Sequence, residues 1–258
     1  MIWDYYRKAG REMPWRETRD PYAIFISEVM LQQTQVDRVR PKYEAWLATF
    51  PTWETLASAP VSKVLTAWQG LGYNRRALAL KRAAEMVVSL HGGTLPKDRQ
   101  ALDDLPGIGA ATAGSLSAFC FNLPEIFIET NIRRVYIHFF FPKKADVTDA
   151  QIEKLLALSV DQKNPREWYY ALMDYGAYLS KTTVNANKRS KHYAVQSRFE
   201  GSRREVRGAI LREVLKRPQE TDALYHTLPF SKERIDEVIR LLTEEGFLVC
   251  KNNLVLPS

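Results

Sequence analysis

Cysteine is scarce in this sequence, and long apolar runs are missing. The 258 residues include two cysteines, Cys120 and Cys250, far apart and in apolar surroundings, which argues against a disulfide or a metal site and favours buried thiols in a reducing cytosol. No apolar run approaches the roughly 20 residues that a membrane-spanning helix needs. The opening Met1-Ile2-Trp3-Asp4 does not begin a signal peptide, and no internal repeat or low-complexity tract occurs. We therefore expect a cytoplasmic protein, nucleoid-associated in a prokaryote, with no membrane contact.

Charge is abundant and unbalanced. Lysine and arginine total 37 against 30 acidic residues, which gives a net charge of +7 at pH 7. A basic surface favours an anionic partner, nucleic acid first, although many basic proteins bind none. With 45% hydrophobic and 11% aromatic residues, the composition is that of an ordinary globular protein. The length allows one large domain or two smaller ones.

Apolar residues recur at helical spacing through the first two thirds of the chain, which predicts a mainly α fold. Met13-Pro14 should end the first helix, Thr52 should cap a short one, and Gly92-Gly93 should end a long basic one. No strand is expected before residue 245. Helices are expected at residues 1–12, 22–33, around 39–47, at Leu56, up to Trp68, at 75–90, and near 149–160 and 166–179.

The composition changes near residue 180. Residues 180–191 are polar with weak periodicity, which predicts an extended segment, and residues 188–217 are strongly basic. Helices are expected from Arg203, after Glu220 and from Ser231, where serine is a good N-cap. Residues 247–250 and 254–256 then flank 251–253 as a small hairpin. This order predicts a winged-helix-like domain at 198–258, which either binds DNA or packs against another protein surface.

A helix breaker with two glycines lies between two helix-compatible segments, at Leu105-Pro106-Gly107-Ile108-Gly109. Such a turn exposes backbone N–H groups at a helix N-terminus, and these groups bind a phosphate without reading sequence. Glycine lets the backbone approach a ligand closely. Alone, the motif is a weak signal and favours a plain helix–helix turn. The residues expected to contact the DNA backbone are Leu105, Gly107, Ile108, Gly109, Ala110 and Ala111.

Three segments together carry a family resemblance: residues 105–135, the string Ser27-Glu-Val-Met-Leu-Gln-Gln-Thr-Gln-Val36, and Gly70-Leu-Gly-Tyr73. They resemble the helix-hairpin-helix (HhH-GPD) DNA glycosylases, and most closely the adenine DNA glycosylase branch (MutY type). The resemblance covers about residues 1–180. It implies a glycosylase domain at 1–195 with two helical lobes around a cleft: a helical barrel of about 21–130, and a second lobe from 1–20 plus 131–195.

The resemblance also implies roles by position. Glu28 matches the acid that protonates the departing base, and Glu129 with Asn131 completes the catalytic group. A base must leave the duplex before a pocket can hold it, and wedges fill the gap left behind. Glu28, Tyr73 and Met13 each also have a purely structural interpretation, as a solvated position or as core. The pocket residues are Met13, Trp15 and Arg16, and the wedge and opposite-base residues are Gln33, Thr34, Leu71 and Tyr73.

The sequence departs from this family pattern at several places. Glu129 stands where the family has aspartate, and one extra methylene displaces a carboxylate by about 1 Å, which can cost about 100-fold in rate. Three interpretations are open: an adjusted backbone, a different substrate, or weak catalysis. We favour a working but altered site. Ala111 stands where the lyase branch has lysine, so no Schiff base is expected there.

The four cysteines that hold the family's iron–sulfur cluster, spaced C-x6-C-x2-C-x5-C, are also missing. Their positions carry Ser180, Asn187, Ser190 and Gln196, so no cluster is expected in the usual way. We expect no cofactor, apart from a monovalent cation at the carbonyls of 105–108, which the resemblance to related hairpins implies. Nothing resembles the C-terminal domain with which longer relatives recognise 8-oxoguanine.

These observations predict a monomeric, monofunctional glycosylase of base excision repair. Its partner would be double-stranded DNA with a damaged or mismatched base, and its substrate adenine opposite 8-oxoguanine or guanine. One alternative is a glycosylase for another base, such as uracil, thymine, hypoxanthine or another purine. The other is a catalytically silent protein that recognises DNA structure.

Overall fold

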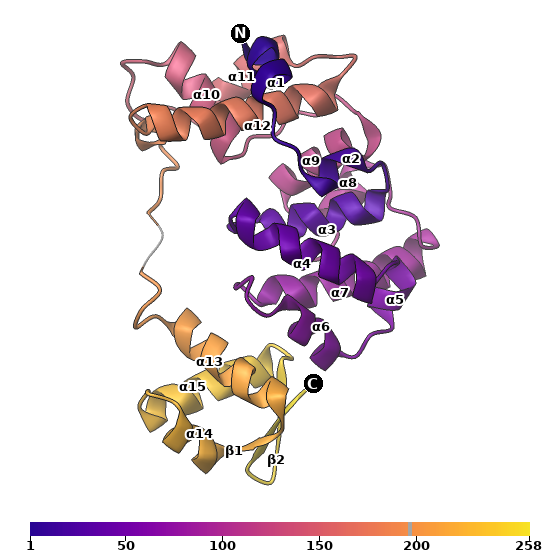
Figure 1. The fold of residues 1–258 in the computed structure, drawn as a ribbon, viewed down its shortest axis with the longest axis vertical. Helices are drawn as coiled ribbons and strands as arrows, with labels where there is room; N and C mark the ends of the chain where they lie inside the picture. Colours follow the sequence, from indigo (N-terminus) through magenta and orange to yellow (C-terminus); the bar gives the residue numbers. More distant parts are fainter. Residues whose placement is uncertain (196–197) are drawn as a thin grey trace. The chain divides into compact units, whose positions relative to one another are not determined.

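The computed structural model describes residues 1–195 and 198–258 and is mainly helical, as predicted (Figure 1). The chain divides into two compact units: Met1–Val29 with Leu95–Val195, and Met30–Thr94 with Gln196–Ser258. These boundaries differ from those expected for the two lobes. The structure groups residues 95–130 with the N-terminal segment and with 131–195, and it groups the C-terminal module with residues 30–94.

In its described part, the first unit consists of helices joined by loops, with one isolated parallel β-bridge between Val147 and Ser190. A helix that the sequence analysis did not foresee, α2, follows Met13, because Pro14 takes the first helical position, where its missing N–H costs nothing. Helix α1 ends at Ala9, earlier than expected. The elements of this unit are α1 (Ile2–Ala9), α2 (Pro14–Glu17), the start of α3 (Pro21–Leu31), α8 (Arg99–Asp103), α9 (Ala110–Phe121), α10 (Thr130–Phe140), α11 (Asp149–Ser159), α12 (Pro165–Thr182) and the 3-10 turn η1 (Ala186–Arg189).

Small residues on α9 allow close packing in the core of this unit. Residues 113–120 of this helix are all buried. A Cβ added at Gly114 would lie 2.6 Å from the Cβ of Phe127, so only glycine fits there. Phe119 on α9 stacks on Tyr170 of α12 with ring centroids 4.7 Å apart. Helices α10 and α12 pack along each other (Figure 1). Together these contacts pack α12 against both α9 and α10 in the core of this unit.

The second unit combines helices from the middle of the chain with the C-terminal module. The predicted cap at Thr52 is confirmed, since its side chain accepts a hydrogen bond from the Thr55 N–H. Gly92 ends the long basic helix in the left-handed conformation (φ 59°), also as predicted. The elements are α4 (Val36–Thr49), α5 (Trp53–Ala57), α6 (Val61–Trp68), α7 (Arg75–His91), α13 (Arg203–Lys216), β1 (Gln219–Glu220), α14 (Thr221–Thr227), α15 (Lys232–Glu244), β2 (Leu248–Lys251) and β3 (Leu254–Pro257).

The C-terminal helices and hairpin match the predicted winged-helix order. Asn252 and Asn253 turn the hairpin with φ of 48° and 64°, values that asparagine tolerates, and Cys250 pairs with Val255 in the antiparallel ladder. The prediction that no strand precedes residue 245 is wrong. Gln219–Glu220 forms β1 against β3, giving the sheet order β1-β3-β2. Two residues are too few to show the alternation of apolar and polar side chains that marks a strand in a sequence. Strand β1 forms because β3 offers it hydrogen-bonding partners.

Three further expectations need adjustment. Both cysteines are free, but only Cys120 is buried, because Cys250 lies exposed on the end strand β2. Residues 180–191 are less extended than expected, since α12 continues to Thr182 and η1 follows. Ser231 is the N-cap residue of α15, but its side chain makes no capping hydrogen bond. No helix in the described part of the chain is both long and apolar enough to span a membrane.

Candidate active site

Glu28 is the one residue of α3 between Tyr22 and Met30 that is not fully buried. Its neighbours on that helix are apolar apart from Ser27, whose hydroxyl donates to the Ile24 carbonyl 2.7 Å away. A carboxylate on a helix that is otherwise in the core is costly unless it is partnered or protonated. Its remaining exposure makes the carboxyl group accessible from outside the core.

A single hydroxyl contacts the Glu28 carboxylate. Ser115 on α9 donates to Oε2 over 2.6 Å, and the same Ser115 Oγ lies 2.9 Å from the Thr112 carbonyl oxygen. Ser115 therefore suits both protonation states of the glutamate. It donates to the ionised carboxylate, and it accepts from the protonated acid while donating to Thr112 instead.

The surroundings hold the pKa of Glu28 near neutrality. Burial raises the pKa to about 7, the Ser115 hydrogen bond opposes that rise, the charge of Glu129 adds to it, and the charge of Arg16 lowers it. The structure thus brings the two predicted catalytic carboxylates close enough to interact. At pH 7 a substantial fraction of Glu28 carries a proton, as a general acid requires.

Glu129 is the N-cap of α10. Its Oε1 accepts from the backbone N–H of Asn131 at 2.7 Å and of Ile132 at 2.8 Å, and its Oε2 accepts from the Asn131 side-chain amide at 3.2 Å. The longer glutamate side chain folds back to the place where a shorter capping residue would bond. Burial raises the pKa of Glu129, whereas these N–H groups and the Arg134 and Arg133 charges favour the ionised form. Oε1 is fully used by the cap, which leaves Oε2 as the oxygen with spare lone pairs.

The predicted pocket residues lie in the same unit but are well covered. Met13 and Trp15 are each 3% exposed. The Arg16 side chain is 7% exposed and makes two hydrogen bonds of 2.9 Å to the buried Asp174 carboxylate, while its guanidinium carbon lies 4.4 Å from the centre of the Tyr170 ring. Arg16 is thus a fixed cation near Glu28. A direct role of these three residues in holding a base stays a prediction.

A tight contact between α10 and α12 positions Asn131. A Cβ on Gly176 would lie 2.4 Å from the Asn131 carbonyl oxygen, so glycine is required there. The Arg134 side chain donates both to Asn131 Oδ1 at 2.7 Å and to the Gly176 carbonyl at 2.8 Å. The start of α10, which carries Glu129 and Asn131, is therefore held by backbone contact and by a buried guanidinium.

Side-chain hydrogen bonds anchor the segment at whose positions the sequence analysis found no cluster cysteines. Asn187 donates to the Thr130 carbonyl at 3.0 Å, Ser180 donates to the Ala177 carbonyl at 2.6 Å, and the Ser190 hydroxyl accepts from the His192 N–H at 3.1 Å. These oxygen and amide groups do not fit a cluster that needs thiolates. Gln196 lies outside the described residues. Within residues 1–195 and 198–258, no three His, Cys, Asp or Glu side chains gather as a metal site would require.

The glycine-containing turn joins α8 to α9, as predicted for two helices around a breaker. Leu105 and Ile108 are buried and anchor the turn, and the Ile108 N–H donates to the Leu105 carbonyl at 3.0 Å. Gly107 has φ of 80°, which favours glycine, and Gly109, the N-cap of α9, has open space around it. Gly107, Gly109, Ala110 and Ala111 are exposed, so the first backbone amides of α9 face solvent. This arrangement can receive an anion.

In the second unit, three of the four predicted wedge and opposite-base residues, Thr34, Leu71 and Tyr73, contact Arg76, which the sequence analysis missed. Its guanidinium donates to the Gln32 carbonyl at 2.6 Å and to Thr34 Oγ1 at 2.9 Å, and its carbon lies 5.6 Å from the centre of the Tyr73 ring. Thr34 also donates to the Leu71 carbonyl at 3.4 Å. Leu71 itself is buried (2% exposed), so it is not offered to a duplex in this conformation.

Two of these residues have strained backbones. Gln33 has φ of 54° and Tyr73 has φ of 47°, although neither is glycine or asparagine. The left-handed region costs such residues about 1–2 kcal/mol each. Strain of this kind persists where the surrounding structure imposes it, and it concentrates at functional sites. Both residues were selected from sequence alone as DNA contacts, and that role stays a prediction.

Sequence reasoning missed Ser115, Tyr170 and Asp174. Ser115 lies in a run of small residues without clear periodicity, so nothing local marks it as a partner of Glu28. Asp174 gave a usable signal, because it is a lone carboxylate among apolar and aromatic residues of a helix and such a group needs a buried cation.

The chain is similar in sequence to known proteins. The family model for the HhH-GPD superfamily base excision DNA repair proteins matches residues 26–161. The chain is 36% identical to the adenine DNA glycosylase of Buchnera aphidicola subsp. Baizongia pistaciae, over 69% of the chain and 51% of that protein. It is 34% identical to the human adenine DNA glycosylase, over 67% of the chain and 34% of that protein. The chain thus spans half or less of the length of these relatives.

Two solved structures are similar in fold. A thermostable thymine-DNA glycosylase matches with a TM-score of 0.62 and 28% identity, over 68% of the chain and 82% of that protein. A trapped complex of endonuclease III with DNA matches with a TM-score of 0.59 over 69% of the chain and 82% of that protein, and at 20% identity it shows the fold alone.

Proposed function

Because the chain belongs to the HhH-GPD superfamily of base excision DNA repair proteins, we propose that it is a DNA glycosylase that removes adenine from mismatched duplexes. The observation that carries this proposal is the Glu28 carboxyl, with a pKa of about 7, together with a second, half-buried carboxylate, Glu129, whose charge acts on it. Cleavage of an N-glycosidic bond needs an acid for the departing base and a negative group near the developing oxocarbenium ion. The two glutamates supply these two functions.

Glu28 is the acid. It gives its proton to a ring nitrogen of the flipped adenine, and the bond between C1′ and the base breaks with its electron pair going to the base. A water molecule then adds to C1′ and returns a proton to the Glu28 carboxylate, which restores the enzyme. Ser115 keeps a hydrogen bond to Glu28 through both states, because its hydroxyl can accept or donate.

Glu129 is the charge-stabilising carboxylate. Its Oε1 is held by two backbone amides of α10, so its position is fixed before the substrate binds. Oε2 faces the positive charge that develops at the sugar, and preorganised groups of this kind stabilise a transition state without reorganising. The helix cap takes up the extra methylene of Glu129. This supports a site that works with glutamate at the position where the family has aspartate.

The enzyme is monofunctional and holds no cluster. Ala111 lies exposed at the start of α9 and offers no amine for a covalent intermediate, so the product is an abasic site with an intact strand. The exposed amides of the 105–111 turn bind phosphate, and Gln33 and Tyr73 contact the bases.

A panel of duplexes tests the proposal: adenine opposite 8-oxoguanine or guanine, and uracil, thymine and hypoxanthine in mismatches. At enzyme excess we expect adenine release and no borohydride-trapped adduct. Glu28→Gln should abolish release with duplex affinity retained, whereas the exposed Glu153→Gln should behave as wild type. No release from any duplex would refute the proposal.

A thymine substrate is the second candidate. The observation that favours it is the likeness in fold, at 28% identity, to a thymine-DNA glycosylase. Release of thymine opposite guanine, without release of adenine, would establish this second function and exclude the first.

A further inference from the structure

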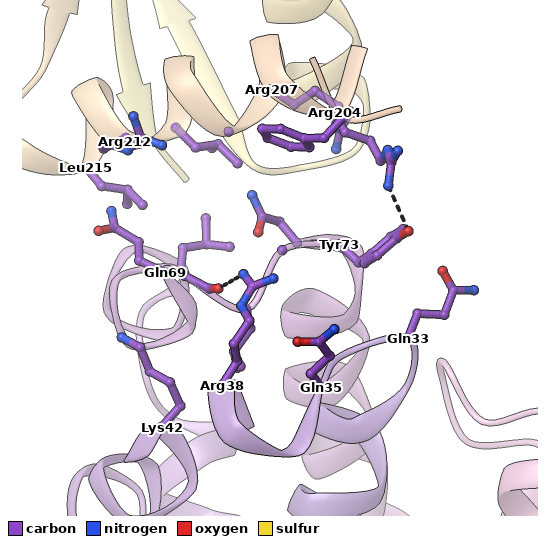
Figure 2. A pocket seen from close by; sticks show the side chains of 18 residues that line it. Gln33, Gln35, Arg38, Lys42, Gln69, Tyr73, Arg204, Arg207, Arg212 and Leu215 are labelled. Atoms are coloured by element: carbon purple, nitrogen blue, oxygen red, sulfur yellow. Dashed lines mark hydrogen bonds between the residues drawn. The ribbon is translucent and has the colours of Figure 1, made fainter. Parts of the chain in front are cut away.

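A cavity of about 860 Å³ lies in the second unit, bordered by the α3–α4 turn, the loop before α7 and helix α13 (Figure 2). Five cationic side chains line it: Arg38, Lys42, Arg204, Arg207 and Arg212. Among the residues that line it there are also the amide side chains of glutamine and asparagine, and there is no aspartate or glutamate. Clustering cations around a cavity without acids is unfavourable unless an anion is bound there.

The nearby carboxylate does not neutralise the cavity. Glu245 pairs with Arg207 at 2.7 Å and with Arg75 at 2.6 Å, and the two guanidinium groups hold the pKa of Glu245 at about 2. In the part of the chain that the structure describes, Lys42 and Arg212 form no ion pair. Positive charge therefore remains at the cavity wall and is available to a ligand.

The C-terminal module is joined to the loop before α7 at this cavity. Arg204 donates to the Tyr73 hydroxyl at 2.9 Å, and its guanidinium carbon lies 5.5 Å from the centre of the Tyr73 ring (Figure 2). Arg76 lies 5.6 Å from the same ring centre. Tyr73 is thus held by two guanidinium groups, one from α7 and one from α13. The module fixes a residue for which the sequence predicted a DNA contact.

The chemistry of the cavity fits a nucleic acid strand better than a single small anion. Arg38, Gln33, Gln35 and Arg212 are exposed, so a polymer can lie along them. Phe199, also in the lining, is 59% exposed, and an exposed aromatic side chain among cations is a feature of surfaces that bind nucleic acid strands. The amide side chains add donors and acceptors for phosphates and base edges.

We propose that this cavity binds the sugar–phosphate backbone of the duplex, and that the C-terminal module is thereby a DNA-binding part of the enzyme. This inference rests on the glycosylase function proposed above. Lys42 and Arg212 each contact a phosphate. Arg204 has a positioning role through Tyr73.

The test compares two double variants of the full chain with the same change in charge. Lys42→Gln/Arg212→Gln removes two cations of the cavity, and Lys216→Gln/Arg217→Gln removes two exposed cations at the end of α13 that do not line it. Duplex affinity is measured by fluorescence anisotropy between about 50 and 200 mM salt. Each lost phosphate contact lowers the slope of log K against log salt by about 0.9, so the cavity variant should lose about 1.8 and bind about tenfold or more weakly at 100 mM salt.

The control variant should keep the wild-type slope and the wild-type rate of base release. A single Arg212→Glu variant should weaken binding more than Arg212→Gln, which a loss of packing alone would not produce. Equal slopes for the two double variants would overturn the proposal. The proposal would also be overturned if the cavity variant lost the ability to bind dAMP but bound the duplex as the wild type does, because the cavity would then be a nucleotide pocket.

Failure of the inference and failure of the proposed function are distinguishable. Base release by the wild type and the control variant tests the function without involving the cavity. If both release adenine but the cavity variant binds the duplex normally, only the inference fails. If neither releases any base, the catalytic proposal fails while the salt slopes still report whether the cavity binds DNA.

Discussion

Replacing Glu28 by glutamine should change how stability depends on pH. Folding raises the pKa of this carboxyl from its ordinary value of 4.5 to about 7, because burial disfavours the charged form. The folded protein therefore holds the Glu28 proton more tightly than the unfolded chain does. The stability that this group contributes is complete below about pH 4.5 and is lost as the pH rises through about 7.

The size of the effect follows from the two pKa values. A difference of this size corresponds to about 3 kcal/mol at the rate of about 1.4 kcal/mol for each pKa unit. Glutamine resembles the protonated acid and cannot ionise. The free energy of unfolding of Glu28→Gln should therefore equal that of the wild type at pH 4.5 and exceed it by about 3 kcal/mol at pH 8. In a chain of this length that difference raises the thermal midpoint by about 6 °C or more.

The assay is a series of thermal melts, followed by circular dichroism between pH 4.5 and 8. Glu153→Gln removes an exposed carboxylate of α11 and serves as the control for the loss of one charge. Its midpoint should follow the wild type throughout the series. Parallel midpoints for Glu28→Gln and the wild type from pH 4.5 to 8 would refute the reasoning, since Glu28 would then not titrate differently in the folded state.

Further changes test other contacts of the site. Ser115→Ala removes a hydrogen bond that stabilises the ionised carboxylate more than the acid, so the pKa of Glu28 should rise above about 7, and the alkaline limb of the base-release profile should move up with it; an unmoved limb would exclude this coupling. Gly176→Ala places a Cβ 2.4 Å from a backbone oxygen of α10, which should cost about 1–3 kcal/mol in melts and slow single-turnover release; a neutral result would contradict the tight contact. Asn187→Ala removes the hydrogen bond to the Thr130 carbonyl and should lower the free energy of unfolding, measured by thermal melts, by about 1–2 kcal/mol. Ser180→Ala loses only a local hydrogen bond and should lower it less.

Much of the fold was predictable because its signals are local. Helical periodicity, the cap at Thr52 and the stop at Gly92 predicted most of the succession of helices, and the turn at 105–109 lies between α8 and α9 as expected. The helix α2 and the strand β1 were missed. Each is only a few residues long, so neither shows a period, and β1 exists only because β3 offers it a partner.

The candidate site, too, was predictable only in part from the sequence. The family resemblance supplied the predicted roles of both Glu28 and Glu129, and Glu28 also lies among apolar residues of its helix. Neither source could show that Glu129 caps α10, because that depends on where the carboxylate of a longer side chain reaches in three dimensions. Ser115 lies 87 positions from Glu28 along the chain, and no local pattern connects them.

The sequence by itself determined the helical class, the hairpin turn and the basic character, since these depend on neighbouring residues and on composition. The tertiary structure alone decided how the chain divides into compact units and which distant residues meet. Only folding buries Glu28 beside Glu129 and brings its pKa to about 7, and only folding joins Arg204 to Tyr73 beside a cationic cavity. Burial and close contact arise between residues that are far apart in the chain. No single stretch of sequence therefore shows the pKa of Glu28 or the charge of the cavity.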